Sequence, residues 1–494
     1  MEIDIIKKLI KSHVLNFEEK RKRMDIGERY YKNESDITQK KTKFENFEDV
    51  DIKPKNKNPM RNADNRIPFP YHKILVDQKA SYMMGEPPKL ITDIDNFDDQ
   101  INNLLGNKFN KVAKDLVVNA ANMGVAWLHV WKSESDGSFK YGIVDSRQII
   151  PIFSPKLDSE LLGCFRVYPS LTDEGKAINV AEYWTEKECE VFYKESGKEW
   201  DSLQEYNQFD LVDIATNETI GSTNVTKNEW GKVPFIPFFN NSVKMSDLDL
   251  VKDIIDAYEK VFSGFVNDLD DLQEVIFILT NYSGTDKQAF LNDMKTYKML
   301  KFEVDEGEQA GIDTLQLEIP IEARKELLDR AENAIYNQGM GVNPTKDDFS
   351  NTSGAALKFI YSLLELKAGV TETEFRLGFD LFMEFVLMHL GKDPKTPIEQ
   401  NWQRSSIQNV EENADILSKL ADITSKQNIA KNNPLVPKGK WEEELKLLEE
   451  PDSYDREPNI LEETLSTDKA GTTEQGGGVR DGVQPAAKGN AKVN

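Results

Sequence analysis

A long helical pattern at residues 352–391, preceded by a short polar segment, constrains the fold more than any other feature. Apolar residues recur along it at helical spacing, among them Phe359, Leu364, Phe375 and Phe382. About 40 residues at ~1.5 Å each predict a rod of roughly 60 Å, longer than most globular helices. Gly391 is a plausible end point, because glycine readily adopts the left-handed conformation that closes a helix.

The second half of this helix is apolar nearly all round, and such a helix is expected to be buried. A membrane span is the main alternative. Glu374, Arg376, Asp380 and Glu384 interrupt the run, however, and a bilayer core tolerates few charges. The pattern therefore favours a buried helix in a soluble protein that has no contact with a membrane.

Size and charge restrict the class of protein. The 494 residues are enough for two to four domains. Their 86 acidic and 62 basic residues give a net charge of −24, which argues against a DNA-binding protein that grips phosphates. Cys164 and Cys189 are the two cysteines, too few for a disulfide framework, so we expect a cytoplasmic origin.

The first half of the chain predicts helices followed by an antiparallel sheet. Residues 1–33 read as a helix with a basic cluster at 20–23, which we interpret as a solvated face, with a partner contact as the alternative. A further helix is expected at 97–123. Strand-like runs then flank Asp136 and Gly137, a dipeptide typical of hairpins. Residues 60–240 are thus predicted to form one α+β domain.

The second half predicts helices around a small α/β module. A helix is expected at 246–272, with Ser246 and Asp249 resembling a capping box. Within the module we expect strands at 275–280, 300–305 and 314–319 and a helix at 286–297, and after it a helix at 321–337. Short helices are expected at 410–425 and 440–450, and the glycine-rich residues 470–494 are expected to be disordered.

The search for catalytic chemistry finds little. Gly339-Met-Gly341 resembles half a dinucleotide fingerprint, but it follows a helix rather than a strand. Acid pairs at 270–271 and 347–348 could bind a divalent ion in a nuclease, but such pairs are expected by chance among 86 acidic residues. We therefore predict no catalytic residue, no cofactor and no metal site. The four histidines lack metal-ligand spacing and are expected to be structural: His13, His72, His129 and His389.

Three segments carry a resemblance to a known family. They read NRIPFPYHKILVDQKASYMMGEPP at 65–88, VDSRQIIPIF at 144–153 and NTSGAALKFIYSLLELKA at 351–368. In this order they resemble the portal proteins, or head-to-tail connectors, of tailed bacteriophages, of the type found in long-tailed phages of Gram-positive hosts. The resemblance covers roughly residues 20–460.

The resemblance implies a fold and an assembly. The fold is α+β, a mostly helical portal fold with an antiparallel sheet in the wing and a small α/β clip. About twelve subunits assemble as a ring around a DNA channel. The implied parts are the wing at 1–240, the first stem helix at 241–272, the clip at 273–320, the second stem helix at 321–341, the tunnel loop at 342–351, the long wing helix at 352–391, the crown at 392–469 and a disordered tail at 470–494.

The tunnel loop is the implied functional site. Lys346 is the one cation expected to touch phosphate, offset by two adjacent aspartates. A plain helix–helix connection is the alternative interpretation of this segment. The residues expected to face DNA are Asn343, Pro344, Thr345, Lys346, Asp347, Asp348, Phe349 and Ser350.

The resemblance implies a non-enzymatic function. The ring would occupy one capsid vertex, pass double-stranded DNA without sequence specificity during packaging and ejection, and dock the terminase and then head-completion or adaptor proteins. Major capsid and scaffold proteins are further implied partners, and the location is the virion, with assembly in the host cytoplasm. Two alternatives stay open: a metal-dependent phage nuclease that uses Asp/Glu pairs, and a monomeric scaffold or interaction protein.

Overall fold

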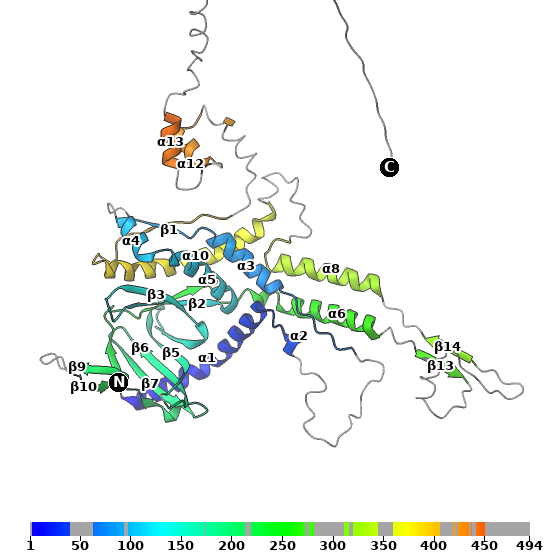
Figure 1. The fold of residues 1–494 in the computed structure, drawn as a ribbon, viewed down its shortest axis with the longest axis horizontal. Helices are drawn as coiled ribbons and strands as arrows, with labels where there is room; N and C mark the ends of the chain where they lie inside the picture. Colours follow the sequence, from blue (N-terminus) through cyan, green and yellow to red (C-terminus); the bar gives the residue numbers. More distant parts are fainter. Residues whose placement is uncertain are drawn as a thin grey trace, which may run out of the picture. The chain divides into compact units, whose positions relative to one another are not determined.

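A computed structural model gives the fold of the chain (Figure 1). Contacts divide the chain into two units, Met1–Ile407 and Gln408–Asn494. The structure describes residues 2–39, 63–92, 97–172, 174–212, 219–271, 276–280, 311–315, 320–343, 359–405, 418–419, 423–433, 436 and 441–449.

Antiparallel sheets are formed by residues 125–239 of the first unit, as the period-2 pattern predicts. One sheet has the order β12-β2-β3, and a larger sheet has the order β11-β7-β6-β5-β4, with β8 paired to β7. Their strands are β2 (Val125–Lys132), β3 (Phe139–Val144), β4 (Ile149–Phe153), β5 (Leu161–Leu171), β6 (Ala177–Trp184), β7 (Glu188–Glu195), β8 (Gln204–Glu205), β11 (Val225–Lys227) and β12 (Phe235–Phe239). The α+β class is therefore confirmed.

The hairpin predicted from Asp136 and Gly137 is present between β2 and β3. Gly137 has a φ of +66°, and the Asp136 carboxylate accepts a hydrogen bond from the Ser138 N–H at 3.1 Å. Two-stranded pairs complete the strands of the unit: β1 (Lys89–Ile91) with β15 (Glu399–Asn401), and β9 (Phe209–Val212) with β10 (Thr219–Thr223). The chain thus returns at 399–401, inside the predicted crown, to pair with a strand of the predicted wing.

Helices pack on these sheets, and one predicted helix is wrong. The expected single helix at 97–123 is two helices, α4 (Phe97–Leu105) and α5 (Lys108–Met123), because Gly106 has a φ of +60° and breaks the run. Gly124, at a φ of +80°, ends α5. The other N-terminal helices are α1 (Ile3–Tyr31), α2 (Asp36–Gln39) and α3 (Tyr71–Met84).

The predicted long helix is α10 (Ser362–His389). Its buried side chains belong to the largest hydrophobic core among the described residues. Its Phe375, Phe379 and Phe382 are each at most 1% exposed and pack with β12, α5 and β3. Gly391 ends it as predicted, with a φ of +68°, and the Lys392 N–H bonds the carbonyl of the third residue from the helix end.

Two expectations for this helix are corrected. It is assigned from Ser362, with a turn at Tyr361, rather than from 352, and 352–358 lie outside the described residues. Its second half is not buried all round, because Leu377 is 62% and Leu381 38% exposed. The core covers only the face opposite these leucines, so α10 presents apolar side chains to solvent.

Two further helices run side by side in Figure 1: α6 (Lys252–Asp271) and α8 (Ile321–Gln338). Asp268 near the end of α6 pairs with Arg324 near the start of α8 at 2.5 Å, so the pair is antiparallel. Between them in sequence, β13 (Ile276–Thr280) pairs with β14 (Gly311–Leu315). β14 begins three residues before the predicted strand, and the expected elements at 286–297 and 300–305 lie outside the described residues.

The second unit contains α12 (Lys426–Asn432) and α13 (Trp441–Glu449), and α13 matches the helix predicted at 440–450. Most of the helix expected at 410–425 and all of 470–494 lie outside the described residues. Among the helices that the structure describes, none combines the length and the apolar character needed to cross a bilayer.

Candidate functional site

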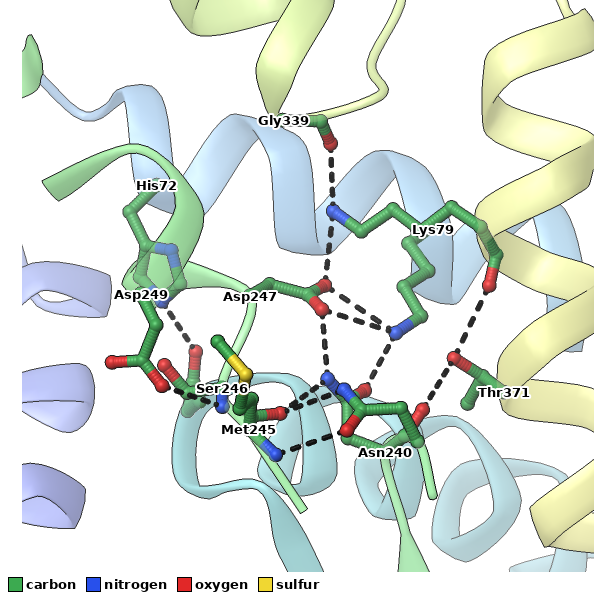
Figure 2. Close-up of polar contacts among 12 residues, drawn as sticks. His72, Lys79, Asn240, Met245, Ser246, Asp247, Asp249, Gly339 and Thr371 are labelled. Atoms are coloured by element: carbon green, nitrogen blue, oxygen red, sulfur yellow. Dashed lines mark hydrogen bonds and ion pairs between the residues drawn. The ribbon is translucent and has the colours of Figure 1, made fainter. Parts of the chain in front are cut away.

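The candidate site is the junction from which the predicted tunnel loop leaves α8. Four segments meet there: α3, the turn before α6, the end of α8 and the first half of α10 (Figure 2). Of the eight loop residues predicted from the sequence, the structure describes Asn343. Pro344, Thr345, Lys346, Asp347, Asp348, Phe349 and Ser350 lie outside the described residues.

Two glycines allow the end of α8 to press against α3. A Cβ at Gly339 would lie 2.5 Å from Leu75 Cδ1, and a Cβ at Gly341 would lie 2.9 Å from Gln78 Oε1 and still closer to Leu75. Met340 between them has a φ of +52°, so the chain turns sharply here. Gly339-Met-Gly341, which resembled half a dinucleotide fingerprint, therefore has a packing role: it permits a close approach that a side chain would block.

The Gln78 side chain fixes the first residue of the predicted loop. Its amide donates to the Val342 carbonyl at 2.7 Å and accepts from the Val342 N–H at 3.0 Å. The Gly341 N–H also bonds the Tyr336 carbonyl at 2.9 Å, which closes the end of α8. Asn343 is buried, at 8% exposure, and its amide lies 3.4 Å from Glu332 of α8. The structure therefore places Val342 and Asn343 at an anchored base.

A buried charge cluster lies beneath this base. Asp247, 5% exposed, accepts from Lys367 Nζ at 3.0 Å and from the Asn240 amide at 2.8 Å, and Lys79 Nζ lies 3.4 Å away. Lys79 donates to Asn240 Oδ1 at 2.6 Å, and Lys367 donates to the Gly339 carbonyl at 2.9 Å. Figure 2 shows these contacts converging on Asp247. Lys367 thus links the α8 end directly to the cluster.

The pKa values of the cluster follow from burial and charge. Burial lowers the pKa of Lys79 to about 8, although Asp247 acts to raise it. Burial acts to raise the pKa of Asp247, but Lys367 and Lys79 oppose this and hold it well below its usual range. Asp247 is therefore ionised, and two buried ammonium groups depend on one carboxylate. Removing such a carboxylate leaves uncompensated buried charge, which typically costs 3–5 kcal/mol.

The cluster also joins the sheet to α10. The Thr371 hydroxyl donates to the Asn240 carbonyl at 3.0 Å, just after β12. Two helical turns after Thr371, a Cβ at Gly378 would lie 2.6 Å from the Phe238 ring, so α10 and β12 are in close contact. The base of the predicted loop is therefore attached to the main core rather than to a peripheral element.

The segment 65–88 contains α3, which brings Gln78 and Lys79 to the junction, and the first residues of the segment bind α6. The Asn65 N–H bonds Asn267 Oδ1 at 2.5 Å and its amide bonds Asp270 at 2.6 Å, both on α6. Phe69 packs edge-on against Tyr258 of α6, with ring centroids 4.9 Å apart. In the sequence, this segment is distinguished by its resemblance to a family and by its order of polar and aromatic residues.

The structure also bears on the residues considered for metal and redox chemistry. Asp270 bonds Asn65, and 347–348 lie outside the described residues. Across the described ranges, no group of three or more His, Cys, Asp or Glu is placed to hold a metal ion. Cys164 and Cys189 are buried free thiols. His72 bonds Asn122, and His129 stacks on Phe235, with burial lowering each histidine pKa to about 4.

Comparison with known proteins gives consistent matches. The model of the family described as "Phage portal protein, SPP1 Gp6-like" matches residues 12–457. The portal protein of Clostridium phage phiCD119 is 37% identical over 466 residues, covering 91% of this chain and 96% of that protein. The portal protein of Bacillus phage SPP1 is 28% identical over 479 residues, covering 91% and 90%.

Solved structures give a weaker likeness. The chain titled "Neck of empty GTA particle computed with C6 symmetry" matches at a TM-score of 0.38 with 13% identity, covering 76% of this chain and 90% of that chain.

Proposed function

Because this chain belongs to the SPP1 Gp6-like family of phage portal proteins, we propose that about twelve copies form a ring at one capsid vertex around a channel for double-stranded DNA. The observation that carries the proposal is the family match over residues 12–457. The DNA enters during packaging and leaves at ejection, and the ring does not catalyse a reaction. The geometry described above supplies parts suited to each step.

The paired helices α6 and α8 are suited to line the channel. Counting from the sequence, α6 carries six acidic and two basic residues and α8 four acidic and three basic residues, a net charge of −5 for the pair. Symmetry repeats this charge in every copy, and twelve chains of −24 would carry on the order of −290 before screening over a ~8–10 Å Debye length. Acidic walls bind few phosphates, so DNA slides without being held.

The exposed stripe of α10 is suited to pack against the neighbouring copy. It consists of large apolar side chains at helical spacing, between 37% and 64% exposed: Leu363, Leu366, Val370, Leu377 and Leu381. From Leu363 to Leu381 it spans 18 residue steps, about 27 Å at ~1.5 Å per residue. A patch of this kind on a soluble chain usually marks an interaction site. The side chains of the stripe itself are uncharged, so they add no like-charge repulsion between two copies.

Charges on another face of α10 are paired within the chain. Arg376 binds Glu372 at 2.6 Å, and Arg404 binds Glu372 at 2.5 Å and Glu365 at 3.1 Å. These pairs are neutral overall, and a polar border on one side of an apolar patch is compatible with a subunit interface.

Residues 344–350 are the part of the tunnel loop that we propose faces DNA. Our proposal leaves out Asn343, which is buried at the base of the loop. The hydrogen bonds of Gln78 to Val342 and of Lys367 to Gly339 would keep the base fixed while the following residues move with the DNA. Lys346 would contact phosphates, with Asp347 and Asp348 limiting the strength of that contact.

The partners follow from the same division of the chain. The terminase, and later head-completion or adaptor proteins, would dock at the clip, residues 273–320. Major capsid and scaffold proteins would contact the wing, residues 1–240, and residues 392–469 would form the crown inside the capsid. The protein would assemble in the host cytoplasm and remain in the virion.

Deleting residues 344–350 tests the loop separately from the ring. The base contacts at 339–343 are kept in this variant, so rings should form with unchanged mass while packaging of DNA into proheads falls sharply. Unchanged packaging would remove the role given to the loop. Loss of rings would instead show that the segment is needed for assembly. Mg²⁺-dependent DNA cleavage by the purified wild-type protein would favour the nuclease alternative, and a monomer on size measurement would favour the scaffold alternative.

A further inference from the structure

An apolar cavity of about 390 Å³ lies between α1, the strands β2, β4 and β12, and the segment 243–249. This volume is within the range of ligand pockets. Val243 and Met245 at its border are 69% and 38% exposed, so the cavity opens to solvent. Its apolar lining consists of Phe17, Met24, Met123, Val125, Trp127, Ile149, Ile150, Pro151, Phe153, Phe239, Val243 and Met245.

Cations border the same cavity. Lys20 and Arg23 reach it from α1, and Lys244 reaches it from the opposite side. Two members of the basic cluster at 20–23, expected from the sequence to be a solvated face, thus lie at an apolar opening. Arg23 also binds Glu19 at 2.7 Å, and the acidic residue on the border is Asp249, whose carboxylate accepts the Ser246 N–H at 3.1 Å.

The position of Lys244 is built rather than incidental. Its φ is +60°, a backbone conformation that residues other than Gly, Asn and Asp rarely adopt. Its ammonium group lies 4.2 Å from the centroid of the Phe239 ring and 4.9 Å from that of Phe153, so two aromatic faces hold it beside the cavity. Burial and the nearby charge of Lys20 lower the pKa of Lys244, and Glu374 opposes this shift. Positive charge is therefore concentrated here on a chain of −24.

We propose that this cavity binds a large apolar side chain of an acidic peptide segment presented by a partner protein. The apolar lining would take the side chain, and Lys20 and Lys244 would pair with carboxylates on either side of it. A DNA backbone fits less well, because it has no apolar group to fill a cavity of this size. The inference goes beyond the portal function and does not depend on the ring.

Peptide binding to the full-length protein tests the proposal. The probe is a fluorescein-labelled DELFDE hexapeptide, followed by fluorescence anisotropy. We expect saturable binding, with much weaker binding of NQLFNQ, which lacks the charges, and of DEGSDE, which lacks the apolar groups. Lys20→Glu should weaken DELFDE binding about fivefold, the size expected when one exposed ion pair is lost. Lys22→Glu, an equal charge change on the same exposed helix but away from the cavity, should change it less than twofold.

A proximity measurement locates the bound peptide. Val243→Cys places an exposed thiol at the cavity border, and Leu211→Cys, also at an exposed leucine, places one on β9 as a control. A chloroacetyl-DELFDE peptide should label the first much faster than the second. Absence of saturable binding, equal effects of Lys20→Glu and Lys22→Glu, or equal labelling of the two thiols would overturn the proposal. Displacement of the peptide by a 20-base-pair DNA duplex would also overturn it, in favour of a phosphate-binding face.

Discussion

Replacing Asp247 by Asn should destabilise the first unit by about 3–5 kcal/mol, the usual result of removing one partner from a buried ion pair. Asn has nearly the same shape and keeps an acceptor oxygen, so packing changes little. The loss is electrostatic, because Lys367 at 3.0 Å and Lys79 at 3.4 Å would be left buried without a carboxylate. Asp249→Asn, two residues away on an exposed carboxylate, is the matched control and should cost less than about 0.5 kcal/mol.

The assay is urea unfolding followed by tryptophan fluorescence. With a slope of about 3 kcal/mol per M, the Asp247→Asn midpoint should fall by roughly 1–1.7 M. The pH dependence gives a second check. A lysine whose pKa is lowered in the folded state destabilises the fold at pH values below that folded pKa. The destabilisation is relieved as pH rises from the folded to the unfolded pKa, which for Lys79 is the window from about 8 to 10.5. Without Asp247 this relief begins at lower pH, so the gap from wild type should narrow at pH 9.

A double variant separates charge from other causes. Lys79→Met removes one of the two stranded cations, so Asp247→Asn with Lys79→Met should be more stable than the sum of the single changes predicts, by at least about 1 kcal/mol. An Asp247→Asn variant as stable as wild type, or a coupling near zero, would refute the account of the cluster as a buried charge balance.

Further predictions concern the glycines, the stripe and the buried histidines. Gly341→Ala should destabilise the end of α8 and speed hydrogen exchange at 336–343, because its Cβ would clash with Leu75 and Gln78. Gly369→Ala meets open space and should instead stabilise α10 by roughly 0.5–1 kcal/mol. An equal change in stability in the two variants would contradict the packing role of Gly341. Leu366→Asp with Leu377→Asp should convert rings to small species without loss of helical circular dichroism, and intact rings would exclude the stripe from the interface. The pKa values of His72 and His129 are each lowered to about 4, so their stabilising contribution is present above pH 6.5 and is lost as pH falls towards 4; a urea midpoint that stays constant from pH 6.5 to 5 would contradict this.

Local signals in the sequence predicted local structure well. Asp136 and Gly137 indicated a hairpin, and Gly391 indicated a helix end, because each requires a specific backbone conformation that few residues adopt. The same reasoning failed at Gly106, which was read as part of a helix at 97–123. A glycine inside a periodic pattern is compatible with both a helix and a break, and only the packed structure decides between them.

The junction was harder to predict because its parts are far apart in sequence. Lys79, Asp247 and Lys367 are charged residues, which are usually exposed, and their proximity depends on how α3, the turn before α6 and α10 pack. Gly339 and Gly341 were noticed, but their spacing alone could not distinguish phosphate binding from close helix packing. The resemblance to a family located the loop without explaining what holds its base.

The exposure of α10 shows a limit of burial arguments. Its apolar second half was expected to lie inside the chain, whereas Leu377 and Leu381 are exposed in the single subunit. Hydrophobicity predicts that a surface will be covered but does not specify whether the same chain or another copy covers it. The stripe is consistent with the proposed ring, in which a neighbouring subunit would provide the cover.

Electron microscopy of the purified full-length protein, viewed end-on, tests the central claim most directly. We expect closed rings of about twelve subunits around an open centre lined by the paired helices α6 and α8. Single subunits without a central opening would contradict the proposed ring.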